Sequence, residues 1–458
     1  MKQRCGRDGM KAHWRILTKT ITRLLTLICP PHAGKRSAIP VLMLLVSLAL
    51  CRTTLAQAVS TMPLPQWVES SAPLSFWSAI ASSADGSKLV ACSSVDGLYA
   101  SSDSGATWRR SSAAPNAAWN SLAGSADGLR WIAGADSSPI YLSRDGGGTW
   151  QATGSPLNSW ISVASSEDGN RLLAATDGAI YFSSDAGDHW IQTDAPARPW
   201  SQIVCSADGS RWVALMSPTY DDNDQIVEPI SIYASTDLGA TWTWVKALDS
   251  DSSWATAALT ADGTTIVVGM AGGSSSDVGG GGRIITSSDG GGTWNMASVP
   301  EPVVSVAVSA DGARLFAATS WWNPAVGHVY RYSDGGKTWL SNDETYRPWQ
   351  AVTCSADGLK VAAAASPFGG GFGPIPPVLG GIYTATTPAP MSVTTRGGSL
   401  ILHWPAWAIG YDLQECTDFK AGIWSGIQAR PDSDGVTASV TLPLESASGA
   451  RFFRLVQP

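Results

Sequence analysis

The feature that most constrains this chain is a tandem repeat, marked by Asp-Gly pairs that return every 40 to 54 residues. Asp-Gly suits a tight turn between antiparallel strands, and a period of this length is typical of one four-stranded propeller blade. The spacing predicts an all-β fold, a seven-bladed β-propeller. The seven pairs are Asp85-Gly86, Asp127-Gly128, Asp168-Gly169, Asp208-Gly209, Asp262-Gly263, Asp311-Gly312 and Asp357-Gly358.

A second motif, Ser-x-Asp-x-Gly-x-Thr-Trp, follows most of these turns. Five copies begin at Ser101, Ser143, Ser183, Ser235 and Ser287, and a sixth begins with Tyr332 in place of Ser. An Asp carboxylate in such a turn accepts backbone N–H bonds, Gly tolerates a left-handed backbone, and Trp supplies a large apolar face. We therefore interpret its aspartates as structural. They are Asp103, Asp145, Asp185, Asp237, Asp289 and Asp334.

The last repeat has no copy of this motif, whereas an unpaired strand-like segment stands at residues 66–71. We expect this segment to pair with the strand that bears Tyr383 and to complete the seventh blade, which leaves few exposed strand edges. Residues 388–458 show short alternating runs without the repeat, and these predict a small β-sandwich-like module. The predicted propeller therefore spans residues 59–387.

The first 58 residues have the pattern of a signal peptide. Lys35-Arg36 precede an apolar run over residues 39–50, and Ala56-Gln57-Ala58 has the small-x-small form of a cleavage site. We expect a mature protein that is secreted, periplasmic or on the cell surface, has no membrane span and is a monomer. It would carry 20 basic and 36 acidic residues, a balance that disfavours nucleic acid as a partner.

The cysteines leave two alternatives open. Cys205 and Cys354 occupy the same position of two repeats, where they are either small buried side chains or a disulfide formed after export. The chain shows no Cys/His cluster with the spacing of a metal site, and we expect no metal and no cofactor.

Propeller topology sorts the connections onto two faces. The Asp-Gly turns and the second motif lie on one face, and the B–C loops and D–A connections lie on the other, which we call the variable-loop face. Aromatic residues on that face are the candidate ligand-binding residues. If the tryptophans that begin innermost strands point into the channel they form a collar, and if they point between blades they are core. The candidates are Trp77, Trp119, Trp160, Trp200, Trp254, Trp349, Trp321, Trp322 and Tyr220.

The second motif is identified as the Asp box, or bacterial neuraminidase repeat, of the sialidase superfamily. The resemblance to sialidases ends with the boxes, because Arg130, Arg171, Arg211 and Arg314 recur in repeat phase and the early arginine motif of sialidases has no match. Over residues 60–387 the chain resembles the photosystem II assembly factor family. That resemblance implies a protein-binding or assembly scaffold without catalytic residues. We expect its partner to be a protein or a carbohydrate. The alternative is a carbohydrate-active enzyme, either a glycoside hydrolase or sialidase-like, with paired carboxylates across the channel mouth.

Overall fold

The computed structural model describes the chain in segments, and every regular element in them is a β-strand. The segments are residues 67–112, 114–223, 225–248, 252, 254–271, 281–320, 327–332, 339–341, 347–366, 380–386, 392–396, 399–405, 412–416, 425–427, 431–433, 437–443 and 452–456. None of these segments contains a helix long and apolar enough to cross a bilayer.

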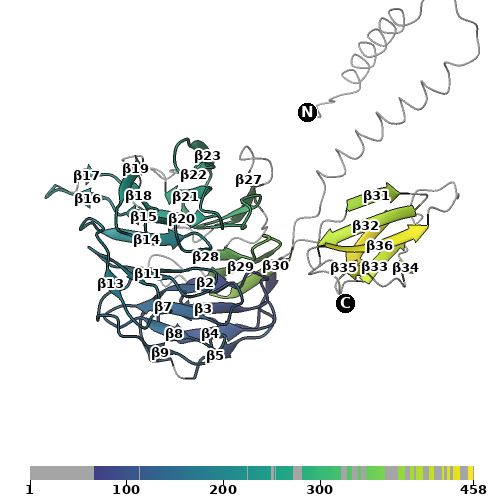
Figure 1. Cartoon of the computed structure of the whole chain (residues 1–458), viewed down its shortest axis with the longest axis horizontal. Coiled ribbons are helices and arrows are strands. Elements are labelled where there is room, and N and C mark those ends of the chain that lie inside the picture. Colours follow the sequence, from purple (N-terminus) through teal and green to yellow (C-terminus); the bar gives the residue numbers. More distant parts are fainter. Residues whose placement is uncertain are drawn as a thin grey trace, which may run out of the picture. The chain divides into compact units, whose positions relative to one another are not determined.

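Between residues 67 and 386, the described strands form seven sheets of four antiparallel strands each (Figure 1). Six of the sheets follow the chain from the innermost strand to the outermost. They are β2 (Trp77–Ser82), β3 (Leu89–Ser93), β4 (Gly97–Ser101) and β5 (Arg109–Arg110); β6 (Trp119–Gly124), β7 (Trp131–Ala135), β8 (Tyr141–Ser143) and β9 (Gln151–Ala152); β10 (Ser162–Ser165), β11 (Leu172–Ala175), β12 (Ile180–Ser183) and β13 (Ile191–Gln192); β14 (Trp200–Cys205), β15 (Trp212–Met216), β18 (Ser231–Ser235) and β19 (Thr243–Ala247); β20 (Ala255–Leu259), β21 (Ile266–Ala271), β22 (Gly282–Ser287) and β23 (Asn295–Val299); and β24 (Val303–Val308), β25 (Leu315–Thr319), β26 (Val329–Tyr332) and β27 (Trp339–Ser341). A separate hairpin, β16 (Thr219–Tyr220) and β17 (Ile226–Glu228), rises from the fourth sheet.

The seventh sheet joins the two ends of this region. Its strands are β28 (Trp349–Cys354), β29 (Lys360–Ala365), β30 (Ile382–Thr386) and, on the outer edge, β1 (Val68–Glu69). Val68 pairs with Thr384 and Glu69 pairs with Tyr383. The predicted pairing between the segment near Trp67 and the strand of Tyr383 is therefore confirmed.

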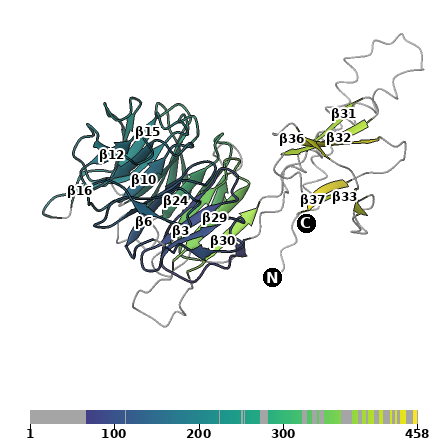
Figure 2. The same cartoon turned by 60° about the horizontal axis from the view of Figure 1, so that its bottom comes forward.

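The innermost strands contact one another in a closed order. Strands β2, β6, β10, β14, β20, β24 and β28 each contact the next, and β28 also contacts β2. Figure 2 shows the consequence at the join, where the green β29 and β30 lie beside the purple β3.

A ring of backbone hydrogen bonds fastens the sheets at their A–B turns. One amide from each sheet donates to one carbonyl of the next sheet, with N···O distances of 2.7 to 3.1 Å. The order of donors is Ala84, Ala126, Glu167, Ala207, Ala261, Ala310 and Ala356, and the last of these donates to Ala84. No member of this ring is left over, so the described sheets are joined in a circle.

The core lies between successive sheets. The second strand of a sheet is buried on both faces, as in β3 and β15, and it therefore has a nearly continuous apolar sequence. Val213 and Ile232 of the fourth sheet, for example, belong to one cluster with Ile266 and Val268 of the fifth. Burial of this apolar surface between neighbours is the main force that holds the ring together.

The described strands between residues 392 and 456 form two further sheets. One contains β31 (Ser392–Arg396), β32 (Ser399–Pro405), β36 (Thr437–Pro443) and β35 (Asp432–Ser433). The other contains β34 (Ser425–Gly426), β33 (Asp412–Cys416) and β37 (Phe452–Val456). Leu402, Trp404 and Val440 of the first sheet share a buried cluster with Leu413 of the second.

Candidate functional site

The Asp-box carboxylates are used within their own turns. Asp103 Oδ1 accepts the Thr107 amide at 2.8 Å, and Asp103 Oδ2 accepts the Thr107 hydroxyl at 2.5 Å. Ser101 Oγ also donates to Asp103 Oδ1, at 2.8 Å. Burial alone would raise the pKa of Asp103, but these hydrogen bonds outweigh it and hold the pKa below its usual value. Gly105 completes the turn with a φ of 89°, where a Cβ would lie 2.6 Å from Thr384.

The same bonds recur in the other boxes that the structure describes, with one variation. The recurring acceptors are Asp145, Asp185, Asp237 and Asp289. In the third box, His189 Nδ1 lies 2.7 Å from Asp185 Oδ2. The backbone and side-chain hydrogen bonds of His189 lower the pKa of Asp185 to about 2, and the same contact raises the pKa of His189. The sixth aspartate, Asp334, lies outside the described residues.

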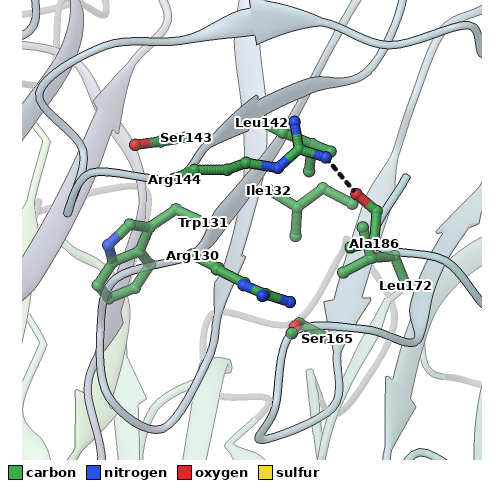
Figure 3. Close-up of a pocket in the computed structure, with 10 residues that line it drawn as sticks. Arg130, Trp131, Ile132, Leu142, Ser143, Arg144, Ser165, Leu172 and Ala186 are labelled. Carbon is green, nitrogen blue, oxygen red and sulfur yellow. Dashed lines mark hydrogen bonds between the residues drawn. The ribbon is translucent and has the colours of Figure 1, made fainter. Parts of the chain in front are cut away.

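Two arginines of this face, Arg144 and the repeated Arg130, connect neighbouring sheets. Arg144 Nη2 donates to the Ala186 carbonyl and to Asp188 Oδ1, each at 3.1 Å. Arg130 donates to Asn170 of the next sheet. Figure 3 shows Arg144 reaching Ala186 across the crevice between the second and third sheets. The cavity there is about 10 Å³, room for one water at most, so the crevice is not a ligand site.

The tryptophans that begin the innermost strands are core, which corrects the collar alternative. Five of them are at most 1% exposed, and each packs edge-on against the tyrosine of the third strand of its own sheet. The ring centroids lie 5.3 to 5.5 Å apart and the interplanar angles are 78° to 87°. The pairs are Trp77–Tyr99, Trp119–Tyr141, Trp160–Tyr181, Trp200–Tyr233 and Trp349–Tyr383. A ligand in the channel cannot stack on an indole that is covered in this way.

Trp254 differs from these five. It is half-buried, and its indole N–H donates to the Val303 carbonyl of the next sheet at 2.9 Å. The indole nitrogen of Trp254 therefore links the fifth and sixth sheets through this hydrogen bond. Trp321 and Trp322 lie outside the described residues.

The channel between the innermost strands has a volume of about 610 Å³ and is lined by residues of all seven sheets. No charged side chain lines it among the described residues. Several of its polar groups are already used between sheets, because Ser121 Oγ accepts the Val163 amide and Ser162 Oγ accepts the Ile203 amide. Ser305 Oγ accepts the Val352 amide in the same way. We therefore interpret these channel hydroxyls as structural.

The variable-loop face is continuous over the first four sheets, since each B–C loop bonds to a neighbouring D–A connection. Ser94 N donates to the Phe76 carbonyl at 3.1 Å. Residues 138 and 158 form a β-bridge, as do residues 177 and 199. Arg198 forms an ion pair with Glu228 of the β16–β17 hairpin. The loops of this region are held as one surface.

Large apolar side chains gather on this surface. Of the exposed large hydrophobic residues among the described ones, seven lie on these loops and connections, and Leu157 is 75% exposed. We call this set the apolar arc: Leu74, Phe76, Val95, Leu157, Ile161, Tyr220 and Val227. Tyr220, the candidate predicted from the loop sequence, is 51% exposed and belongs to the arc. Seven such residues on this face, against Leu129 and Leu238 on the turns and boxes of the other, make it the candidate binding face.

Carboxylates stand on the same loops and connections as the apolar arc, and we call them the acidic rim: Asp96, Asp136, Asp177, Asp194, Asp221, Asp222 and Glu228. Two are held in place by hydroxyls, because Ser75 donates to Asp96 and Ser159 donates to Asp136. Backbone N–H bonds from Gln225 and Asn223 lower the pKa of Asp221. Two basic side chains contact these residues, since Arg110 donates to the Asp96 carbonyl and Arg198 pairs with Glu228, and the seven carboxylates outnumber them.

A buried polar cluster in the sixth sheet was not predicted from the sequence. Val303 stands there in place of the usual Trp, and Glu301, about one-tenth exposed, lies nearby. Tyr330 Oη donates to Glu301 Oε2 at 2.7 Å, and His328 Nδ1 lies 3.0 Å from Glu301 Oε1. Burial, followed by this bond to Glu301, raises the pKa of Tyr330. The only sequence signal for the cluster was the Trp-to-Val exchange at Val303, together with polar residues that the repeat lacks elsewhere.

The ring of sheets and its channel define the class of the fold, a β-propeller, and comparison with known proteins agrees with it. A family model described as Sortilin, neurotensin receptor 3, matches residues 138–311. No curated protein matches the chain in sequence.

Three solved structures illustrate the likeness. U3-55K is 9% identical with a TM-score of 0.55, over 70% of this chain and 99% of that one. The GH74 enzyme of Niastella koreensis is 17% identical with a TM-score of 0.51, over 74% of this chain and 59% of the enzyme. YCF48 bound to D1 peptide is 15% identical with a TM-score of 0.49, over 71% of this chain and 99% of that one. At these identities the first two show the fold alone, and the chain spans little more than half of the GH74 enzyme.

Proposed function

We propose that this chain is a secreted, non-catalytic binding or assembly scaffold that presents its ligand site on the variable-loop face. In this proposal it is a seven-bladed Asp-box propeller closed by its N-terminal strand, exported by cleavage near Ala58, with a small β-sandwich-like module at its C-terminal end. The observation that carries the proposal is the difference between the two faces. The Asp-box carboxylates accept hydrogen bonds within their own turns, whereas the other face exposes the apolar arc and the acidic rim.

The test is a peptide and glycan array probed with the purified protein and with two surface variants. Leu157→Ser changes the apolar arc, and Leu129→Ser, on an Asp-Gly turn, is the matched control because Leu129 is also exposed. We expect Leu157→Ser to lower the affinity for the best ligand at least tenfold and Leu129→Ser to leave that affinity unchanged. Equal binding by both variants would place the ligand elsewhere and overturn the proposal.

The alternative function, a carbohydrate-active enzyme, is tested with the same preparations. The likeness to the GH74 enzyme supports only a shared fold. Activity must therefore be measured directly on xyloglucan, other plant glucans and sialosides. The scaffold proposal expects no release of reducing sugar or sialic acid above the level of a heat-inactivated sample. Turnover that co-purifies with the protein would favour the enzyme.

A further inference from the structure

We infer that the partner of the variable-loop face is an extended peptide segment that combines apolar side chains with Lys or Arg. This inference rests on the proposed function and adds the chemistry of the partner. Its basis is the juxtaposition of the apolar arc and the acidic rim on one surface.

The arc gives the contact surface its attraction, because exposed apolar groups gain free energy when a partner covers them. Leu157 and Ile161 belong to the connection between the second and third sheets, and Phe76 lies beside Val95 through the bond from Ser94 to the Phe76 carbonyl. An extended peptide is suited to groups that are spread along a face, since successive residues advance about 3.3 Å. The hairpin β16–β17, which projects beyond its sheet in Figure 1, bears Tyr220 and Val227 at the far end of the arc.

The acidic rim determines which charge on the partner is favourable. Asp136 and Asp177 are exposed carboxylates on the B–C loops of the second and third sheets. The serine hydroxyl beside Asp136 fixes that carboxylate without neutralising it. Opposite charge on a partner raises its association rate and selects it over neutral or acidic competitors. Of the basic residues beside the rim, Arg198 is already paired with Glu228.

The same features disfavour other occupants. An anionic lipid surface, a nucleic acid or the same face of a second copy would bring negative charge against the rim. Saccharide recognition prefers exposed aromatic rings, whereas the arc contains only Phe76 and Tyr220 of that kind and the innermost tryptophans are covered. A basic and apolar peptide meets neither obstacle.

The probe is a fluorescein-labelled peptide of four Lys-Leu-Ser triplets, with Glu-Leu-Ser and Lys-Ser-Ser peptides of equal length for comparison. Binding to the protein expressed from the full-length chain is measured by fluorescence anisotropy from 50 to 300 mM NaCl. We expect a Kd on the order of 10 µM for the first peptide at low salt, at least fivefold weaker binding of the other two, and loss of affinity as salt screens the rim.

Two double variants separate the contributions. Asp136→Asn with Asp177→Asn should weaken the Lys-Leu-Ser peptide at least threefold at 50 mM NaCl and flatten the salt dependence. Phe76→Ser with Leu157→Ser should weaken it at least fivefold at every salt concentration. Glu167→Gln and Leu129→Ser, exposed on the other face, are the controls, and circular dichroism checks that each variant is folded.

Failure of this inference is distinct from failure of the proposed function. If the array finds a glycan or an acidic peptide whose binding requires Leu157, the scaffold stands and the inference about a basic partner is wrong. The inference is also wrong if the Lys-Leu-Ser peptide binds with no dependence on salt, or if either double variant binds it as tightly as the unsubstituted protein. If no ligand depends on the variable-loop face, both proposals fail.

Discussion

At the scale of single residues, two cysteine thiols of the innermost strands lie in the wall of the channel. Cys205 and Cys354 line the channel as half-buried residues, and both are free, so the alternative of a disulfide between them is wrong for this structure. Burial raises the pKa of each thiol to about 12. A small reagent that enters the channel therefore meets the unreactive protonated form.

We predict that iodoacetamide at pH 8 labels Cys205 and Cys354 at least about 100-fold more slowly in the folded protein than in urea, where their pKa returns to about 8.5. Because folding raises the pKa of these thiols, their contribution to the free energy of unfolding is fully present below the unfolded pKa of about 8.5. That contribution is lost as the pH rises towards 12. Peptide mapping by mass spectrometry reads out each cysteine separately. Labelling at pH 8 at the unfolded rate would contradict the assignment.

The orientation of the tryptophans could not be read from the sequence, although their positions could. A β-bulge follows the first residue of five innermost strands, as between Trp77 and Ala79 and between Trp349 and Ala351. The extra residue breaks the alternation of faces, so counting from the channel-facing residues gives the wrong side for the indole. By contrast, the bonds of each Asp box are local to one turn, and local chemistry is what the repeat encodes.

At the scale of elements, the decisive strand is β1, which has two residues and both side chains exposed. Its value lies in its backbone, because it covers the outer edge of β30 that would otherwise be left unpaired. Trp67 stands ten residues before Trp77, as Trp150 stands before Trp160, and this spacing was enough to predict the pairing. The buried cluster around Glu301 was not predictable, since it depends on contacts between side chains 27 and 29 residues apart.

We predict that Val68→Pro lowers the free energy of unfolding by about 1–3 kcal/mol, because proline removes an amide from β1 and restricts its neighbour. Val68→Ala keeps the amide and is the control. Urea denaturation gives the stability, and hydrogen exchange of residues 382–386 should accelerate in the proline variant alone. Unchanged exchange there would mean that β1 contributes nothing to the seventh sheet.

At the scale of the whole molecule, the ring closes with strands from distant parts of the chain. Val68 and Thr384 are paired across the join. A disulfide in place of this pair would link residues more than 300 positions apart, and a loop of that size removes up to about 5 kcal/mol of chain entropy from the unfolded state.

We predict that Val68→Cys with Thr384→Cys, once oxidised, raises Tm by several degrees, and that dithiothreitol reverses the gain. The two single variants serve as controls for the substitutions themselves. A double variant that oxidises without any rise in Tm would show that separation of the ends is not how the fold begins to open.

The ring of backbone hydrogen bonds at the A–B turns has an electrical consequence. Each N–H···O bond from Ala84 to Ala356 runs to the next sheet in the same rotational sense, and the last bond returns to Ala84. Dipoles aligned along a helix sum to opposite partial charges at its ends. Hydrogen bonds arranged in a closed circle have no first or last member, so their dipoles cancel. These bonds therefore give that mouth of the channel no net dipole, and the charge there comes from side chains such as the exposed Glu167.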